Sequence, residues 1–339
     1  MQSRNDEKFS LRENCRTRFL KDVLGKVREE SPSDGDFILI LDQSTTKIIS
    51  SLVTTFDLLS ENVLLLENLQ LVRKPFPTIS AIYFITPSAD SIDRMLKDFK
   101  DAKTQMYLCA HVFFTDSVSS TLMTTMKSHK YFSSVVRTLQ IVNLNFSCPY
   151  ENEFSLDMQA TIPRIFSQEE LNVREPVAQE IASKLATLIP NLLEYKKIHI
   201  IHGKNERNDI SKRVAELLYS KVKSMVELRE KSVEERKDHD SYDEEDDMED
   251  LIPPIKILIV DRAADPLTPL THDLYYRSLM VDLCNISTST QYEDVGENGE
   301  PVTKSLSFND EDDLFIKYRY KHIVDCVDGI AKEFKEFIK

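Results

Sequence analysis

The sequence predicts an α/β protein in which parallel sheets are covered by helices. Short apolar segments alternate along the chain with segments of helical periodicity, which is the pattern of strand–helix–strand units. Several apolar segments are continuous instead of alternating, as strands buried on both faces of a parallel sheet require. We therefore expect an open parallel sheet first, then a second, incomplete α/β domain, and then a mainly helical segment.

The first domain is expected to span residues 1–147. Apolar residues at near-helical spacing predict an amphipathic helix over residues 10–30. Five apolar segments predict strands at residues 37–41, 63–66, 81–85, 107–114 and 139–144. The helical patterns between them cover residues 46–61, 91–99 and 118–130. This alternation predicts a parallel open sheet with helices on both faces.

The second domain is expected to occupy residues 148–262. Its predicted elements are a short strand at 153–158, a helix that Pro176 opens, a strand at 197–201, a long helix at 210–228 and a strand at 255–260. The continuous apolar run of the last strand predicts burial on both of its faces. The acidic run at 238–250 predicts a disordered loop rather than a calcium site, and deletion of residues 232–251 should change the melting temperature little.

Residues 263–339 are expected to form the first, helical segment of a third domain. A helix is predicted at 271–284, a polar loop at 286–309, and one long helix from about residue 311. The apolar residues of the long helix recur at alternating spacings of four and three, a heptad seam. The seam comprises Ile316, Tyr320, Ile323, Val327, Ile330, Phe334 and Phe337. Because it continues almost to the last residue, we expect an N-terminal fragment whose partner helix lies further along the parent chain.

Composition excludes several classes of function. The net charge of −14 is unsuited to nucleic acids and gives no general attraction to anionic membranes. Six glycines in 339 residues cannot build either glycine-rich phosphate motif, so no nucleotide or other cofactor is expected. The five cysteines are scattered and predict free thiols in a reducing compartment. No apolar run approaches the ~20 residues of a membrane span, and the N-terminus lacks a signal core. These features favour a soluble, cytoplasmic protein.

One stretch, DRAADPLTPLTHDLYY at residues 261–276, is long and specific. Other distinctive segments accompany it in a fixed order: ILDQS, PFPTISAIYFITPSADSI, AHVFFTDS and FNDEDDLFIKYRYKHIVD. Together they resemble the Sec-one/Munc-eighteen (SM) family of syntaxin-binding SNARE regulators, over essentially the whole chain.

The resemblance implies an arch-shaped, non-enzymatic scaffold with a cleft between domains one and three. Its partners would be a syntaxin-type SNARE and the assembled SNARE complex, in vesicle docking and exocytosis. Association with membranes would be indirect, through the SNARE.

Two sets of site residues follow from the resemblance. Lys47 and Glu67 match charged positions that face syntaxin across the cleft, although any one of them could be an ordinary solvated charge. A groove for an N-terminal syntaxin peptide would be lined by Val118, Leu122, Met123, Met126, Leu139 and Ile141. Simple core packing is the more frequent role for Leu122 and Leu139.

The alternative function is an α/β hydrolase or phosphate-handling enzyme. Asp42 and Asp261 follow apolar strands, where α/β enzymes place catalytic groups. Aspartate more often caps or turns the chain at such positions. His111 is expected to be a hydrogen-bonded core residue, and His199 and His202 to point to opposite faces of a strand. No metal site is therefore expected.

Overall fold

The computed structural model describes most of the chain, with gaps. The described ranges are 9–30, 35–158, 160–166, 171–192, 198–203, 209–237, 254–284, 286, 289–295, 301–308 and 312–338. The chain divides into two compact units, Met1–Val260 and Asp261–Lys339, each described here by itself. The acidic run at 238–250 lies outside the described residues.

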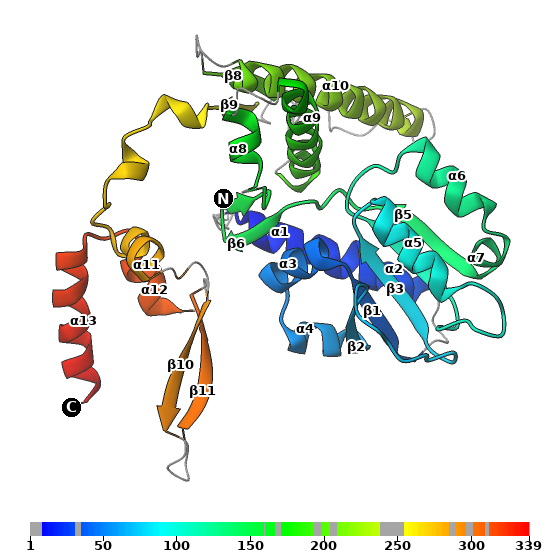
Figure 1. Cartoon of the computed structure of the whole chain (residues 1–339), viewed down its shortest axis with the longest axis horizontal. Helices are drawn as coiled ribbons and strands as arrows, with labels where there is room; N and C mark the ends of the chain where they lie inside the picture. Colours follow the sequence, from blue (N-terminus) through cyan, green and yellow to red (C-terminus); the bar gives the residue numbers. More distant parts are fainter. Residues whose placement is uncertain are drawn as a thin grey trace. The chain divides into compact units, whose positions relative to one another are not determined.

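A five-stranded parallel sheet forms the centre of the first unit (Figure 1). Its strands are β1 (Phe37–Leu41), β2 (Val63–Asn68), β3 (Ser80–Ile85), β4 (Ala110–Phe114) and β5 (Val136–Ile141), in the order β2-β1-β3-β4-β5. β1, β3 and β4 are fully buried, as their continuous apolar runs predict. The predicted parallel α/β class is confirmed.

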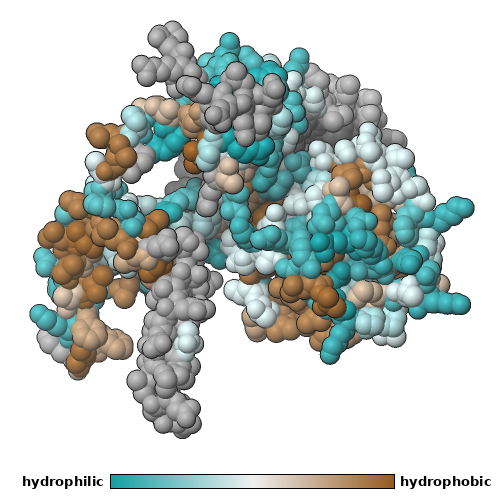
Figure 2. Space-filling view, viewed as in Figure 1, coloured by the Kyte–Doolittle hydropathy of each residue, from teal (hydrophilic) through white to brown (hydrophobic). Residues whose placement is uncertain are grey.

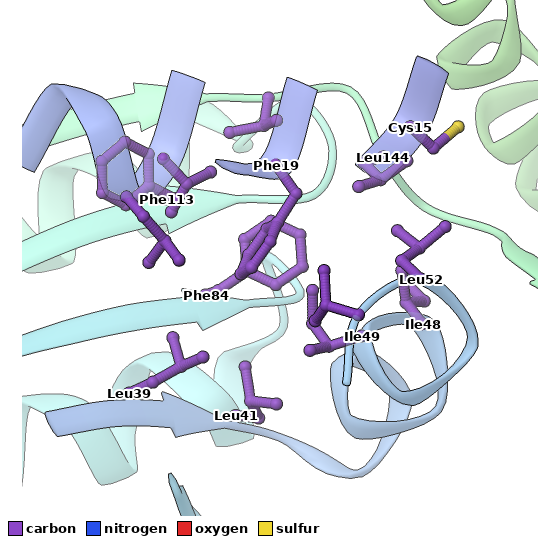
Figure 3. Close-up of a cluster of buried hydrophobic side chains, with 14 of the residues drawn as sticks. Cys15, Phe19, Leu39, Leu41, Ile48, Ile49, Leu52, Phe84, Phe113 and Leu144 are labelled. Carbon is purple, nitrogen blue, oxygen red and sulfur yellow. The ribbon is translucent and has the colours of Figure 1, made fainter. Parts of the chain in front are cut away.

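Helices cover both faces of this sheet. One face packs on α1 (Leu11–Arg18), the π-helical η1 (Phe19–Gly25), α2 (Lys26–Glu30), α3 (Gln43–Leu52) and α4 (Thr55–Ser60). Figure 3 shows Phe19 and Phe113 on this side, close to Phe84, whose ring centroid lies 5.3 Å from that of Phe19. The opposite face packs on α5 (Ala89–Asp98), α6 (Ser120–Ser128) and α7 (Lys130–Val135). Two separate apolar layers therefore fix the sheet between helices.

Several boundaries in the sheet domain differ from the sequence prediction. The helix expected at 118–130 is two helices, α6 and α7, which meet at His129, the residue that caps α7. The helix expected at 46–61 is two helices, because Val53 leaves the helix in extended conformation and Thr54 caps a new one through a capping box with Asp57. β4 starts at Ala110 instead of residue 107, since Tyr107 only bridges to Phe76. β5 runs from 136 to 141 instead of 139 to 144, because its pairing with β4 ends at Ile141.

The rest of the first unit contains two small sheets and further helices. Its elements are β6 (Ser147–Tyr150), β7 (Glu153–Ser155), α8 (Thr161–Phe166), α9 (Leu171–Leu188), η2 (Ile189–Asn191), β8 (Ile198–His202), α10 (Ile210–Lys237) and β9 (Ile255–Ile259). β8 pairs with β9 in parallel, and α9 and α10 share a core with them.

Three predictions for this region were wrong. α9 begins at Leu171, so Pro176 lies inside the helix instead of opening it. α10 extends to Lys237, so residues 232–237 are helical. β9 is not buried on both faces: Ile257 and Ile259 pack on the helices, whereas Leu258 is 65% exposed. The second face has no covering layer among the described residues, and periodicity alone cannot reveal which faces a neighbour covers.

The second unit contains η4 (Arg262–Ala264), η5 (Thr268–Leu270), α11 (Tyr276–Cys284), β10 (Ser289–Val295), β11 (Pro301–Ser307), α12 (Asp313–Tyr318) and α13 (Ile323–Phe337). The helix predicted at 271–284 therefore starts five residues late. The predicted polar loop at 286–309 is instead an antiparallel ribbon, β10–β11. The sequence pattern hid this ribbon, since polar residues dominate both strands.

The predicted single long helix is broken between α12 and α13. The backbone N–H of Tyr276 donates to the carbonyl of Lys321 (3.0 Å) and that of Ile323 donates to the carbonyl of Leu274 (2.8 Å). These bonds tie the break to the start of α11 and interrupt the heptad seam. Val327, Phe334 and other seam residues of α13 are exposed, and apolar side chains cover much of the visible surface of this unit (Figure 2).

Candidate protein-interaction sites

Asp42 holds several elements of the fold together through hydrogen bonds. It caps α3 by accepting a hydrogen bond from the backbone N–H of Thr45 (2.9 Å). Its second oxygen accepts from the backbone N–H (2.7 Å) and hydroxyl (2.6 Å) of Thr86 and from the Ser91 hydroxyl (3.0 Å). The carboxylate is buried. Both oxygens are thus engaged by donors that join β1, β3 and α5.

Asp261 has a similar local role after β9. It caps the short helix η4, where its carboxylate accepts from the backbone N–H of Ala263 (2.8 Å). The residue is buried. Neither strand-end aspartate therefore stands open to a substrate, which removes the geometric basis of the hydrolase alternative.

The three histidines considered above lie in the environments that the sequence predicts. His111 is fully buried in β4, and its Nδ1 lies 2.7 Å from the Thr138 hydroxyl, which confirms it as a hydrogen-bonded core residue. His199 and His202 are exposed on β8 at odd spacing, so they point to opposite faces. In the part of the chain that the structure describes, no group of three His, Cys, Asp or Glu side chains could hold a metal ion.

Lys47 lies on α3, one turn after the Asp42 cap. Its side chain is 57% exposed, and its ammonium forms an ion pair with Asp157, which follows β7. Asp157 has a positive φ of 51°. The residue predicted to face a partner is therefore already engaged by a carboxylate 110 positions away in the sequence.

Glu67, the other predicted cleft residue, lies near the end of β2 and is half-buried. Its carboxylate accepts a hydrogen bond from the Tyr107 hydroxyl. Burial, together with this bond, raises the pKa of Tyr107 above its ordinary value. Glu67 is thus held by a neutral phenol, which leaves its negative charge uncompensated by that contact.

A buried charge network behind Glu67 was not found from the sequence. Arg73 and Asp98 have side chains only 8% and 6% exposed, and Arg73 donates to both carboxylate oxygens at 2.8 and 3.0 Å. Tyr83 donates to Asp98 (2.7 Å), and Arg73 donates to Tyr107 (3.2 Å). Arg73 lies in a non-periodic segment between two strands, where the sequence offers no signal that a charged side chain is buried.

The edge of the sheet beside Glu67 carries an apolar surface that was also missed. β2 is an edge strand, and its central leucines are exposed. Exposed apolar side chains there and nearby are Phe56, Leu59, Leu64, Leu65, Leu66, Leu71 and Val72. Figure 2 shows apolar side chains gathered over α4 and β2. An exposed apolar patch next to charged residues is typical of a protein-binding surface.

The residues of the predicted peptide groove share one face of the sheet. Val118, Leu122 and Met123 are half-buried against the apolar layer that α5, α6 and α7 cover, whereas Met126 is fully buried in it. Strand pairing sets Leu139 beside Val112 and Ile141 beside Phe114, both members of the same layer.

Leu139 and Ile141 are 45% and 41% exposed, so the core-packing role expected for Leu139 is wrong. The cause is that β5 is the second edge strand of the sheet. These exposed side chains of β5 and the half-buried ones of α6 lie on the same face of the sheet, and together they are called the α6–β5 strip.

The Sec1 family model matches residues 37–339. Among curated relatives, the chain is 28% identical over 335 residues to "Protein transport protein sec1" of Dictyostelium discoideum, covering 97% of this chain and 52% of that protein. It is 24% identical to "SNARE-interacting protein KEULE" of Arabidopsis thaliana, covering 99% and 49%. The chain therefore spans about half the length of the curated relatives that it matches.

Solved structures share the fold of nearly the whole chain. The Unc18–syntaxin 1 complex from Monosiga brevicollis matches with a TM-score of 0.76 at 22% identity, covering 97% of this chain and 54% of that chain. Sly1p in complex with an N-terminal peptide of Sed5p matches with a TM-score of 0.69 at 17% identity, covering 98% and 55%. Within the described residues, no helix has the length and hydropathy to cross a membrane.

Proposed function

The chain belongs to the Sec1 family, and from this premise we propose that it binds a syntaxin-type SNARE and regulates SNARE assembly in vesicle docking and exocytosis. The observation that carries the proposal is the fold that it shares, over 97% of its length, with the Unc18 protein of the Unc18–syntaxin 1 complex. The exposed apolar edge at β2, the strand that carries Glu67, has the character of a protein-binding surface.

The mechanism would be conformational and not catalytic. A scaffold that binds one arrangement of a helical SNARE more tightly than another shifts the population toward the first. The chain would require no cofactor for this, and it would reach membranes from the cytoplasm through its partner.

We expect no saturable phosphatase or nucleotidase turnover. Turnover abolished by Asp261→Asn would instead support the hydrolase alternative.

Charge reversal tests the cleft residues. We expect the double variant Lys47→Glu/Glu67→Lys to bind the cytoplasmic domain of a syntaxin-type SNARE more weakly, mainly through a slower association rate at low salt. The matched control is Asp90→Arg/Arg94→Asp, which reverses an exposed ion pair on α5. Equal association rates for the wild type and the cleft variant at low ionic strength would remove these residues from the site.

The α6–β5 strip is proposed as a second site, for an N-terminal syntaxin peptide with a Phe or Leu anchor. A methionine surface adapts to varied apolar anchors. Met123→Lys should abolish binding of such a peptide in a fluorescence titration, because it places a charge where a half-buried apolar side chain packs on the core. Thr124→Lys, on the exposed side of α6, is the control. Unchanged affinity for Met123→Lys would exclude this strip.

A further inference from the structure

We propose that Asp157 is an internal competitor for the partner's carboxylate at Lys47. Its carboxylate forms an ion pair with the Lys47 ammonium in the free protein, so an acidic side chain of the partner must displace it in order to bind there. This inference rests on the proposed function of Lys47. It adds Asp157 as a residue of this chain that sets the affinity and selectivity of Lys47 for the partner's acidic groups.

The position of Lys47 is fixed by its helix. α3 begins with a capping box in which Asp42 accepts from the Thr45 backbone while the Thr45 hydroxyl accepts from the Asp42 backbone, both at 2.9 Å. Ile48 and Ile49 then bury the opposite side of the helix in the sheet core. The ammonium therefore extends from a rigid base, and its reach does not depend on a mobile loop.

The segment after β7 presents Asp157 in a defined conformation. The Asp157 backbone N–H donates to the Ser155 hydroxyl (3.2 Å), and Lys184 of α9 donates to the adjacent Leu156 carbonyl (3.1 Å). The positive φ of Asp157 is a conformation that aspartate and asparagine adopt more readily than other non-glycine residues. Asparagine at this position would therefore keep the backbone and remove only the charge.

The exposure of the pair allows exchange. Lys47 and Asp157 are 57% and 42% exposed, so water and a partner's side chain can approach the contact. Exposed ion pairs are weak, and their loss typically alters an equilibrium constant by about two- to fivefold. A carboxylate of the partner can displace Asp157 from Lys47, but its affinity is then lower by about two- to fivefold than if Lys47 were unpaired. Asp157 thus lowers the affinity for any acidic group that cannot offer Lys47 a better contact.

The first experiment measures affinity. Isothermal titration of the whole chain with the cytoplasmic domain of a syntaxin-type SNARE, at low salt, should give binding about two- to fivefold tighter for Asp157→Asn than for the wild type. The gain should vanish in a Lys47→Met background, because no ammonium is left to release. Asp93→Asn, which breaks the exposed Asp93–Lys97 pair on α5, is the control and should leave affinity unchanged. Equal or weaker binding by Asp157→Asn overturns the inference.

A second experiment needs no partner. The Lys47 amine should react faster with a succinimidyl ester in Asp157→Asn than in the wild type, as followed by peptide mass spectrometry, because the ion pair restricts access of the reagent. An unchanged labelling rate would show that the pair does not form in solution and overturns the inference by itself. A wild-type chain that binds no SNARE overturns the proposed function and the competition together, whereas wild-type binding with no response to Asp157→Asn overturns the competition alone.

Discussion

At the scale of single residues, the main feature is the buried ion pair between Arg73 and Asp98. Burial alone would lower the pKa of Arg73, but its hydrogen bonds and proximity to Asp98 raise it above the ordinary value. Burial and the nearby Asp98 carboxylate raise the pKa of Tyr83, which therefore stays a neutral donor. The network holds the segment between β2 and β3 against α5, close to Glu67.

Loss of one member of this network should be costly. Arg73→Met leaves the Asp98 carboxylate buried without its cation, and we expect the free energy of unfolding to fall by about 3 kcal/mol. Urea denaturation would measure the change. Arg94→Met, which breaks an exposed pair with Asp90, should cost less than about 1 kcal/mol. Equal effects of the two substitutions would contradict the buried network.

A pH-dependent contact joins α9 to α10. Hydrogen bonds from Arg213 and then Gln179 lower the pKa of Glu175 to about 2 from an ordinary 4.5. Because the folded pKa is depressed, the contact is fully formed above pH 4.5 and is lost as the pH falls toward 2. Carbon-13 titration of Glu175 should show its pKa returning toward 4.5 in Arg213→Gln. Lys212→Gln, whose amine pairs with Glu216 instead, should leave the Glu175 midpoint unchanged.

At the scale of elements, the corner between α12 and α13 depends on one glycine. A Cβ on Gly329 would lie 2.6 and 2.8 Å from the Cε1 and Cζ atoms of the Tyr318 ring. Tyr318 is buried there, and its hydroxyl donates to Glu333 (2.6 Å). The ring of Tyr318 can approach the helix backbone this closely only because residue 329 has no side chain.

Gly329→Ala should therefore destabilise the second unit, although alanine favours a helix by about 1 kcal/mol over glycine. Overpacking of this kind typically costs about 1–3 kcal/mol, and thermal unfolding followed by circular dichroism would detect it. Asp328→Ala, on the exposed face of the same helix, is the control. A higher melting temperature for Gly329→Ala would mean that the ring moves aside freely.

At the scale of the whole molecule, the chain consists of two compact units that meet in sequence at Val260 and Asp261. The three apolar core clusters described above all belong to the first unit. A unit with its own cores is expected to fold by itself.

Residues 1–260 expressed alone should keep the sheet domain intact. We expect the melting temperature of the first unit to change by less than about 3 °C, which corresponds to roughly 1 kcal/mol for a unit of this size. Calorimetry of the whole chain and of residues 1–260 makes the comparison. A fall of ten degrees or more, or loss of the cooperative transition, would show that the second unit stabilises the first.

The sequence by itself determined the parallel α/β class, because apolar runs such as 37–41 and 81–85, which are buried on both faces, alternate with segments of helical periodicity. It also placed Leu122, Met123 and Met126 on one helix and Leu139 and Ile141 on one strand, since those periodicities are local, whereas Val118 precedes α6. Asp42 was expected to cap or turn the chain at the end of its strand, and it caps α3.

Only the tertiary structure decided which surfaces stay open. β2 and β5 are edge strands, so Leu64 and Leu139 are exposed although their apolar segments are typical of buried strands. The partner of Lys47 lies 110 residues further along the chain, and the ion pair that accompanies the burial of Arg73 comes from Asp98, on a separate helix. Burial and pairing depend on neighbours that are remote in sequence, and a local pattern carries no information about them.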